Sequence, residues 1–322
     1  IDLLAVFALL AGTATTFSLA TPLMASVIGE LFHVELNRTV VTIIILVLTC
    51  VVYTYSLLHG FKGISFLAKS CIYLFFGLLA YVFLFGGETK YIIETGFSAI
   101  GRVVQNFFQL ATYTDPQRTT SFPQTWTIFY WAYWMVWCVA TPFFIGNISR
   151  GRTVRQTIFG GYLFGCGSTI VSFIILGNYS LGQQIAGAAD YIAMYQKNGD
   201  LYSIIIAIIR TLPCAPLILA LLFITMVAFY ATSFDSIALI GACYSYHKLG
   251  ENESPHKLIE LMWCVLLIAL PIALVFSDSS MSNLQSVSII AAFPIAAVIV
   301  LITFSFLKDA KRYLQEQNKT KK

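Results

Sequence analysis

Uninterrupted apolar runs constrain this chain more than any other feature of its sequence. Several runs reach the roughly 18 to 20 residues that a helix needs to cross a bilayer. The chain is 58% hydrophobic and only 11% charged, whereas soluble domains carry roughly 25% charged residues. The sequence therefore predicts an all-α polytopic membrane protein. We expect no nucleic-acid partner, because the basic residues lie in separate short loops.

Turn and charge signals divide the apolar runs into eight predicted spans. Their approximate bounds are 3–32, 38–58, 64–86, 125–148, 154–177, 214–246, 257–277 and 284–307. Pro213 and Pro216 suit the start of the sixth span, because proline is tolerated in the first helical turn. The chain begins inside an apolar run, with neither an initiator Met nor a basic leader. We interpret residues 1–322 as a single transmembrane domain that lacks N-terminal spans.

The placement of Lys and Arg predicts the orientation of the chain. If the tail at 308–322 is cytoplasmic, an even number of spans places the first residue on the same side. The segments that are then cytoplasmic include the loop at 149–155, with three arginines, and the tail, with six basic residues. Because these segments hold most of the basic residues, we expect a cytoplasmic basic tail.

Segment 91–111, YIIETGFSAIGRVVQNFFQLA, has a different pattern from the spans. Its apolar residues recur along one helical face from Ile93 to Ala111, while Glu94, Arg102 and Gln109 fall mostly elsewhere. This pattern predicts an amphipathic helix that lies in the membrane interface or along the bundle. A second stretch, 181–212, mixes small, polar and apolar residues, and we expect a partly helical cap on the outer side.

The run WTIFYWAYWMVW, residues 126–137, holds four of the chain's five tryptophans. On a regular helix one stripe contains Trp126, Tyr130, Tyr133, Trp134, Trp137 and Thr141. An aromatic belt at the membrane surface accounts for Trp126. Trp134 and Trp137 lie roughly 12 to 17 Å further along the axis at 1.5 Å per residue, where indole N–H groups need polar partners. Packing is one explanation, and a wall that binds a quaternary ammonium group through cation–π attraction is the other.

Polar groups inside the other spans mark candidate ion or coupling sites. The stretch FYATSFDS, residues 229–236, places Thr232, Ser233 and Asp235 in an otherwise apolar helix. Hydroxyls and freed carbonyls bind Na⁺ in discontinuous transporter helices, and interhelical hydrogen bonding is the simpler alternative. Lys69 lies seven residues from Lys62, so its side chain is able to snorkel to the cytoplasmic surface.

No pattern of catalytic residues accompanies these features. The seven cysteines are scattered without a CxxC motif, so neither a metal centre nor a disulfide framework is indicated. The few polar residues of the spans form no set of nucleophile, base and oxyanion donors. The sequence therefore predicts a protein that is not an enzyme and has no resident cofactor.

With these motifs in view, the chain resembles the betaine/choline/carnitine transporter family. The likeness is strongest in FPQTWTIFYWAYW and ISRGRTVR, between residues 122 and 155, and in YATSFDS, and it extends through SLATPL at 18–23. The resemblance implies a leucine-transporter-type inverted-repeat bundle, of which this chain holds about eight of an original twelve spans. It also implies a multi-pass protein of the bacterial plasma (inner) membrane and a homotrimer, with the helix at 91–111 near the contact.

The resemblance also implies roles for individual residues. It places Trp134 in the substrate box and Trp137 one turn along the permeation path, with Tyr133 where a Trp is usual. The substrate-binding residues that we expect are Tyr130, Tyr133, Trp134 and Trp137. The positions that match the family's sodium ligands are Phe229 (through its carbonyl), Thr232 and Ser233. The candidates for coupling or gating are Lys69, Thr141 and Asp235.

The expected function is secondary transport of quaternary ammonium compounds such as glycine betaine, carnitine or choline, by sodium-coupled symport and alternating access. Carnitine/γ-butyrobetaine exchangers are also similar in SLATPL and in YTDP at 113–116. These exchangers work without sodium, with an Arg and a Met in place of the cations. Cys71 and Thr141 stand at the aligned positions, which favours sodium coupling. An osmosensing membrane protein without transport activity is a further alternative, although it would need a longer basic tail.

Overall fold

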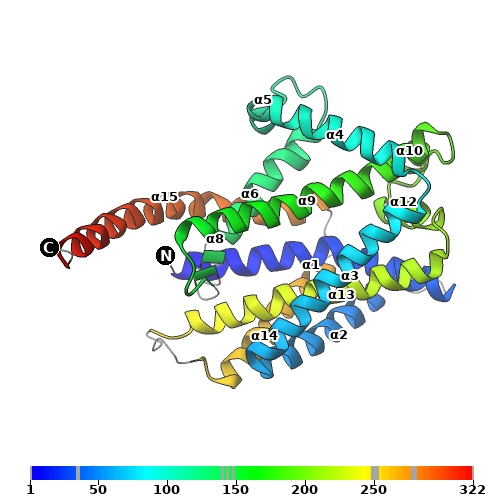
Figure 1. Ribbon diagram of the computed structural model, residues 1–322. Helices are drawn as coiled ribbons and strands as arrows, with labels where there is room; N and C mark the ends of the chain where they lie inside the picture. The colour runs from blue at the N-terminus through cyan, green and yellow to red at the C-terminus, as the bar shows by residue number, and fades with distance from the viewer. Residues whose placement is uncertain are drawn as a thin grey trace.

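The computed structural model describes the chain at residues 2–33, 37–138, 141–142, 145–146, 149–247, 254–276 and 281–320. These residues form helices joined by turns and loops, and no strand occurs among them. Six of the described helical segments are long and apolar enough to cross a membrane, which confirms a polytopic all-α membrane protein (Figure 1). The expected spans at 125–148 and 257–277 include residues outside the described ranges, so the count of eight stays a prediction.

The long helices of the bundle follow the predicted apolar runs closely. Their bounds are α1 (Asp2–Phe32), α2 (Arg38–Leu58), α3 (Gly60–Phe85), α13 (Ala215–Tyr244), α14 (Lys257–Phe276) and α15 (Met281–Thr320). The α13 helix begins where the sequence places it, with Pro216 in its first turn. Proline is suited to this position because its fixed φ angle matches the helix and its missing N–H is not needed there.

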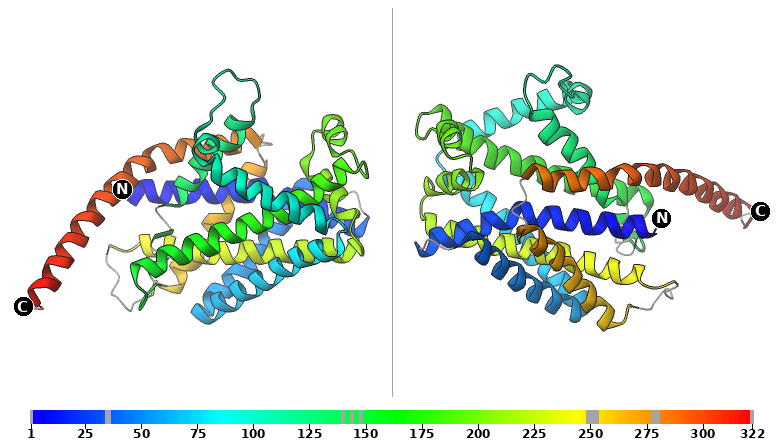
Figure 2. Two further views of the ribbon diagram at one scale, coloured as in Figure 1. Left: turned by 45° about the horizontal axis from the view of Figure 1, so that its top comes forward. Right: turned by 180° about the vertical axis from the view of Figure 1, so that it is seen from behind.

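The α1 and α13 helices lie at the centre of the bundle (Figures 1 and 2). The α13 helix packs against α1, α2, α3 and α14, and α1 also packs against α15 and α6 (Phe129–Trp137). Phe17 of α1 and Phe234 of α13 are fully buried and stack with ring centroids 3.8 Å apart. Such close packing of two central helices fixes which face of each helix is turned toward α6.

Three short helices occupy the stretch predicted to be a partly helical cap, and the last of them packs against α1. They are α10 (Asn178–Ile185), α11 (Tyr191–Asn198) and α12 (Leu201–Arg210). The Tyr202 hydroxyl donates to the Leu19 carbonyl at 2.7 Å. The Arg210 Nε donates to Glu30 Oε1 at 2.6 Å. The helical part of the prediction is confirmed, and α12 is tied to α1 at two points.

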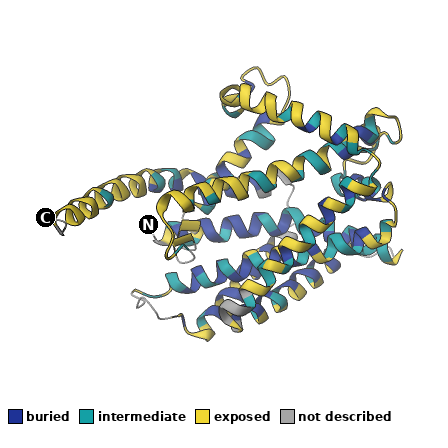
Figure 3. Ribbon diagram, viewed as in Figure 1, coloured by how far each residue is buried: buried dark blue, intermediate teal, exposed yellow. Residues whose placement is uncertain are grey.

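The helical run from Val154 to Ile185 contrasts with the central bundle. It passes through α8 (Val154–Gly160), η2 (Gly161–Cys166), α9 (Gly167–Ser172) and η3 (Phe173–Gly177) before reaching α10. None of its most apolar stretch is buried by the rest of the described structure, as Figure 3 shows by its yellow and teal ribbon. A membrane tolerates such a surface, because lipid chains rather than water cover the apolar side chains.

The segment predicted to be one amphipathic helix at 91–111 forms two helices, α4 (Thr89–Gln105) and α5 (Phe107–Thr112). The break falls at Asn106, whose side-chain amide donates to the Arg102 carbonyl at 2.9 Å. Asn ends helices readily because its side chain competes with the backbone for such carbonyls. Ile92 and Gly96 are buried against the bundle, whereas Phe97 and Val104 of the apolar stripe are exposed.

The α15 helix extends well beyond the bundle (Figure 2). The sequence predicts a span that ends near 307 and a separate tail at 308–322, but one helix continues from Met281 to Thr320. Its last turns are exposed, including Tyr313 and Leu314. Lys, Arg, Gln and Glu favour helix in this stretch, and Arg312 pairs with Glu316 four residues later at 3.1 Å. The basic tail is therefore a helical extension.

Candidate functional site

The loop that leads into the tryptophan-rich segment is organised around Asp115. The carboxylate of this buried residue accepts from the Thr120 backbone N–H at 2.7 Å and from the Thr119 hydroxyl at 2.9 Å. The first of these hydrogen bonds is the main cause of the lowered pKa of Asp115. Gln124 Nε2 donates to the Thr114 carbonyl at 2.6 Å, so the loop is fastened to the start of the segment.

The outer half of the tryptophan-rich segment packs locally. It begins as the π-helical turn η1 (Pro123–Ile128) and continues as α6. Trp126 and Tyr130 stack with ring centroids 6.1 Å apart, and Trp131 Nε1 donates to the Ala111 carbonyl at 3.2 Å. These contacts account for the outer aromatic residues without any ligand.

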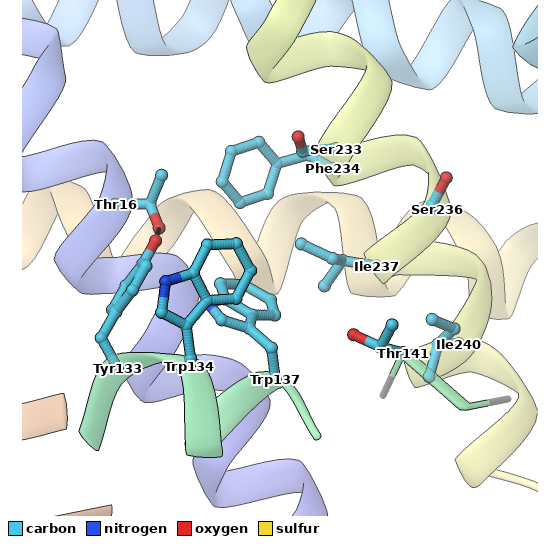
Figure 4. Close-up of a pocket in the computed structure, with 10 residues that line it drawn as sticks. All are labelled: Thr16, Tyr133, Trp134, Trp137, Thr141, Ser233, Phe234, Ser236, Ile237 and Ile240. Carbon is cyan, nitrogen blue, oxygen red and sulfur yellow. Dashed lines mark hydrogen bonds between the residues drawn. The ribbon is translucent and has the colours of Figure 1, made fainter. Parts of the chain in front are cut away.

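The inner half of the same segment faces a cavity of about 310 Å³ (Figure 4). Small-molecule sites usually have volumes of roughly 300–1,000 Å³, so this cavity suits a small substrate. It lies between α6, α1 and α13, and its lining residues are Thr16, Tyr133, Trp134, Trp137, Thr141, Ser233, Phe234, Ser236, Ile237 and Ile240. None of these residues carries a charge.

Helical spacing explains how α13 contributes to the cavity. Ser233, Ile237 and Ile240 lie three and four residues apart, so they project from one face of the helix. On the other side, Tyr133 packs edge-to-face against Trp134 and Trp137, with ring centroids 6.3 Å and 6.1 Å apart. The cavity thus has an aromatic wall on α6 and a wall of hydroxyl and aliphatic groups on α13 (Figure 4).

The structure brings together five of the residues predicted from the sequence. Tyr133, Trp134, Trp137, Thr141 and Ser233 all line the cavity. Trp134 is 64% exposed, so most of its indole surface is available to a ligand. Tyr130 lies outside the cavity lining and is itself exposed. Of the four aromatic residues predicted to bind substrate, Tyr130 therefore lies outside the cavity, and the other three line it.

The three predicted sodium-binding residues have different neighbours in the structure. The α13 helix is unbroken through this region, and residues 229, 232 and 233 are three and four positions apart, so they share one face of it. Phe229 packs edge-to-face against Phe75 of α3, 5.4 Å between centroids. The Thr232 hydroxyl donates to the Ala228 carbonyl at 2.8 Å and is in polar contact with the Cys71 thiol. Only the Ser233 side chain faces the cavity.

Two of the predicted coupling or gating residues also lie away from the cavity. Asp235 is fully buried, and its carboxylate accepts from the Ser56 and Ser236 hydroxyls, each at 3.1 Å. Because Ser56 belongs to α2, this carboxylate joins α2 to α13. Lys69 is exposed on α3, as expected of a snorkelling lysine. Thr141 is the one coupling candidate that lines the cavity.

Sequence patterns did not identify the contribution of α1 to this site. Thr16 lines the cavity from α1 and shares a hydrogen bond with the Tyr133 hydroxyl, 2.5 Å between the oxygens. Phe234, Ser236, Ile237 and Ile240 were also missed. The only available signal for Thr16 is the cluster of threonines in GTATT at 12–16, and nothing in that cluster indicates which helix it contacts.

A second cavity, of about 380 Å³, lies between α4 and the helices from α9 to α10. It is lined mainly by apolar side chains, among them Ile100, Val104 and Phe173. No residue predicted to bind substrate or sodium contributes to it. The cavity beside α6 is therefore the candidate site.

Comparison with known proteins identifies the family. Residues 1–315 match the betaine/carnitine/choline family of transporters. The chain is 28% identical to the uncharacterized transporter YeaV of Escherichia coli strain K12 over 238 residues, which cover 73% of this chain and 49% of that protein. It is 25% identical to a carnitine transporter of Acinetobacter baumannii over 309 residues, covering 96% and 56% respectively. The chain thus spans about half the length of these relatives. It belongs to the betaine/carnitine/choline transporter family, whose members are transporters and not enzymes.

Proposed function

We propose that this protein is a secondary active transporter of quaternary trimethylammonium compounds such as glycine betaine, carnitine or choline. The observation that carries the proposal is the uncharged cavity walled by Trp134 and Trp137. Aromatic faces attract a quaternary ammonium group through the ring quadrupole, and the attraction strengthens where water is excluded. Family membership and the likeness to a carnitine transporter support the same class of substrate.

The opposite wall of the cavity suits the other end of such a substrate. Ser233 brings a hydroxyl group to this wall from α13, and Thr141 brings another from the stretch after α6 (Figure 4). A hydroxyl both donates and accepts hydrogen bonds, so it can pair with a carboxylate or with an alcohol. A molecule with a trimethylammonium head and a polar end therefore matches both walls at once.

We propose sodium as the coupling ion, with Ser233 as its ligand nearest the substrate. The Phe229 side chain packs on Phe75, and the Thr232 hydroxyl donates to the Ala228 carbonyl. Because residues 229, 232 and 233 share one face of α13, the Phe229 carbonyl and the two hydroxyls can approach the same ion. Binding of this ion would be linked to alternating access if ion and substrate bias the same conformational equilibrium.

We also propose that the protein lies in the bacterial inner membrane, with a cytoplasmic C-terminus, and works as a homotrimer. The concentration of Lys and Arg in the tail and in the loop at 149–155 supports the orientation. The exposed apolar stripe of α4, which includes Phe97 and Val104, supports a contact with lipid or with a second copy of the chain.

Uptake into proteoliposomes tests the proposed function. Labelled glycine betaine, carnitine and choline would be offered with and without an inward sodium gradient, at the same membrane potential. We expect accumulation of at least one compound, driven by the gradient. Equal accumulation in both conditions would contradict sodium coupling, and failure to transport all three compounds would contradict the substrate class.

Sodium-independent exchange is the second candidate, and two observations bear on it. Cys71 lies against Thr232, and Thr141 lines the cavity, at the positions aligned with the Arg and the Met of the exchangers. Neither side chain carries a positive charge that could replace sodium, so these observations favour the symport proposal. Counterflow from preloaded vesicles in sodium-free buffer would reveal exchange.

A further inference from the structure

The indole of Trp137 rests directly on the backbone of α1. A Cβ atom built on Gly12 would lie 2.9 Å from Val136 Cγ1, 3.0 Å from Trp137 Cζ2 and 3.2 Å from Trp137 Cε2. A side chain at this position would have to displace Val136 and Trp137, so glycine allows the indole to approach α1. Close approach of helices at small residues is common in membrane proteins. Here the approach fixes one face of the aromatic wall.

Two hydrogen bonds and a ring contact hold the same indole from its side. The Thr16 hydroxyl donates to the Gly12 carbonyl at 2.8 Å. Because a threonine hydroxyl has a single hydrogen, the Tyr133 hydroxyl must donate in its 2.5 Å contact with Thr16. The Tyr133 ring in turn packs edge-to-face against the Trp137 indole, with ring centroids 6.1 Å apart. These contacts connect the α1 backbone to the indole.

The two tryptophans of the cavity therefore differ in how they are held. Trp137 is partly buried, rests on Gly12 and meets the Tyr133 ring at 80°. Trp134 is 64% exposed and also meets the Tyr133 ring edge-on, at 73°. Figure 4 shows Tyr133 with its hydroxyl turned toward Thr16, beside both indoles. Tyr133 thus contacts both indoles, but only Trp137 is also braced by α1.

We propose that Gly12, Thr16 and Tyr133 are positioning residues that fix the Trp137 indole and thereby set the cavity's preference for a full trimethylammonium head. The inference rests on the proposed function. A fixed ring surface loses no conformational freedom when the ligand binds, so its attraction appears fully in the affinity. The family resemblance places a Trp at the position of Tyr133, and a Trp has no hydroxyl to join Thr16. The polar support is thus a property of this chain's own residues.

The first test removes one oxygen atom. Tyr133→Phe keeps the ring but ends the hydrogen bond with Thr16, and Tyr130→Phe is the matched control on the exposed face one turn earlier. We expect Tyr133→Phe to raise the Kd for glycine betaine about tenfold, as loss of a desolvated cation–π geometry implies. We expect the preference for glycine betaine over dimethylglycine to narrow, with kcat changed less than about twofold. Tyr130→Phe should change none of these values.

The second test probes the other end of the contact chain. Thr16→Val removes the hydroxyl, and Thr16→Ser restores it. We expect Thr16→Val to reproduce the weakened binding and Thr16→Ser to bind like the unmodified protein. The double variant Tyr133→Phe with Thr16→Val should bind no more weakly than either single variant, because both remove the same support. If the increases in Kd of the two single variants multiply in the double variant, the proposal is overturned. Equal Kd values for Thr16→Val and Thr16→Ser would also overturn it.

The outcomes separate this inference from the proposed function. If the unmodified protein binds no quaternary ammonium compound, the proposed function fails. If it binds glycine betaine and Tyr133→Phe binds equally well, with the same preference over dimethylglycine, the positioning role fails. If Tyr133→Phe does not fold, the comparison of Thr16→Val with Thr16→Ser decides, since Thr16→Val keeps the shape of threonine without its hydroxyl and Thr16→Ser keeps the hydroxyl.

Discussion

The two halves of the tryptophan-rich segment have similar residues and different surroundings. In the outer half, Trp126 stacks on Tyr130 and the Trp131 indole donates to a loop carbonyl. In the inner half, Trp134 and Trp137 line a cavity opposite the central α13 helix. Composition alone does not distinguish the halves. The halves are distinguished by their position along the helix and by the residues that face them from other helices.

The two halves show where aromatic side chains become available to a ligand. An indole that is hydrogen-bonded to a nearby loop, as Trp131 is, has its polar group satisfied within the protein. The inner indoles instead present ring surface to a cavity lined by hydroxyl and aliphatic groups. The depth predicted from the rise per residue agrees with this division, since the residues assigned to the interior are those that reach the cavity.

The largest expected effect separates the halves directly. Trp134→Leu should raise the KM for a quaternary ammonium substrate roughly 30-fold, because a desolvated cation–π contact is worth about 2 kcal/mol. Trp126→Leu should change KM less than about twofold, since its ring packs on Tyr130 outside the cavity. Uptake kinetics in proteoliposomes measure both values. Equal increases in KM in the two variants would show that the two halves do not differ in substrate binding.

A smaller effect is expected on the wall that faces the inner half. Ser233→Ala should raise the sodium concentration for half-maximal uptake about tenfold, since removing a group that supports a bound metal ion typically costs about 10- to 100-fold in affinity. Ser172→Ala on the exposed α9 helix is the control, because that hydroxyl bonds only within its own helix. Sodium titration of uptake is the measurement. An unchanged sodium requirement in Ser233→Ala would show that the ion binds elsewhere.

The loop that leads into the outer half should affect the pH dependence of stability rather than substrate binding. Hydrogen bonds from Thr120 and Thr119 lower the pKa of Asp115. A group whose pKa is lowered by folding stabilises the folded state above its unfolded pKa, near 3.9, and loses that contribution as the pH falls through its folded value. Asp115→Asn should therefore lower the thermal midpoint at pH 7 and remove the part of the pH dependence that lies below about pH 4.

Thermal unfolding of the two proteins between pH 3 and pH 7 measures this effect. Asp309→Asn, on the exposed extension of α15, is a control that removes a carboxylate without such hydrogen bonds. Identical midpoints for Asp115→Asn and the unmodified protein across the whole range would contradict the role given to this loop.

The smallest expected effect concerns the remaining outer tryptophan. Trp131→Phe loses one hydrogen bond to the Ala111 carbonyl, which is worth about 1 kcal/mol. We expect a slightly lower thermal midpoint and unchanged uptake kinetics. A rise in KM comparable to that of Trp134→Leu would mean that the outer half also contributes to substrate binding.

Much of the fold could be predicted from the sequence, because a bilayer imposes length and composition on every span. The six long apolar helices and the start of α13 near Pro216 follow from these constraints alone. The break at Asn106 could not be predicted in this way, because the helix propensity of one polar residue is weaker evidence than the continuous apolar stripe around it. The helical continuation of α15 was missed for a related reason, since the end of an apolar run is not the end of a helix.

The candidate site could be predicted only from one side. The spacing in α6 identified Tyr133, Trp134 and Trp137, because all three belong to one helical stripe. Thr16 could not be found, since the packing of α1 against α6 is a tertiary contact between residues more than a hundred positions apart. The separation of Ser233 from Thr232 depends likewise on the rotation of α13 about its own axis, which only its packing against α3 and α1 decides.

We propose that the inner half of the tryptophan-rich segment binds a positive charge. Binding of choline and of its neutral carbon isostere, 3,3-dimethyl-1-butanol, tests it most directly, because the two molecules share a shape and differ in charge. Isothermal titration of the purified protein should show choline binding at least about 30-fold more tightly. That preference should largely disappear in Trp134→Leu and persist in Trp126→Leu. Equal affinity of the unmodified protein for both molecules would contradict the account.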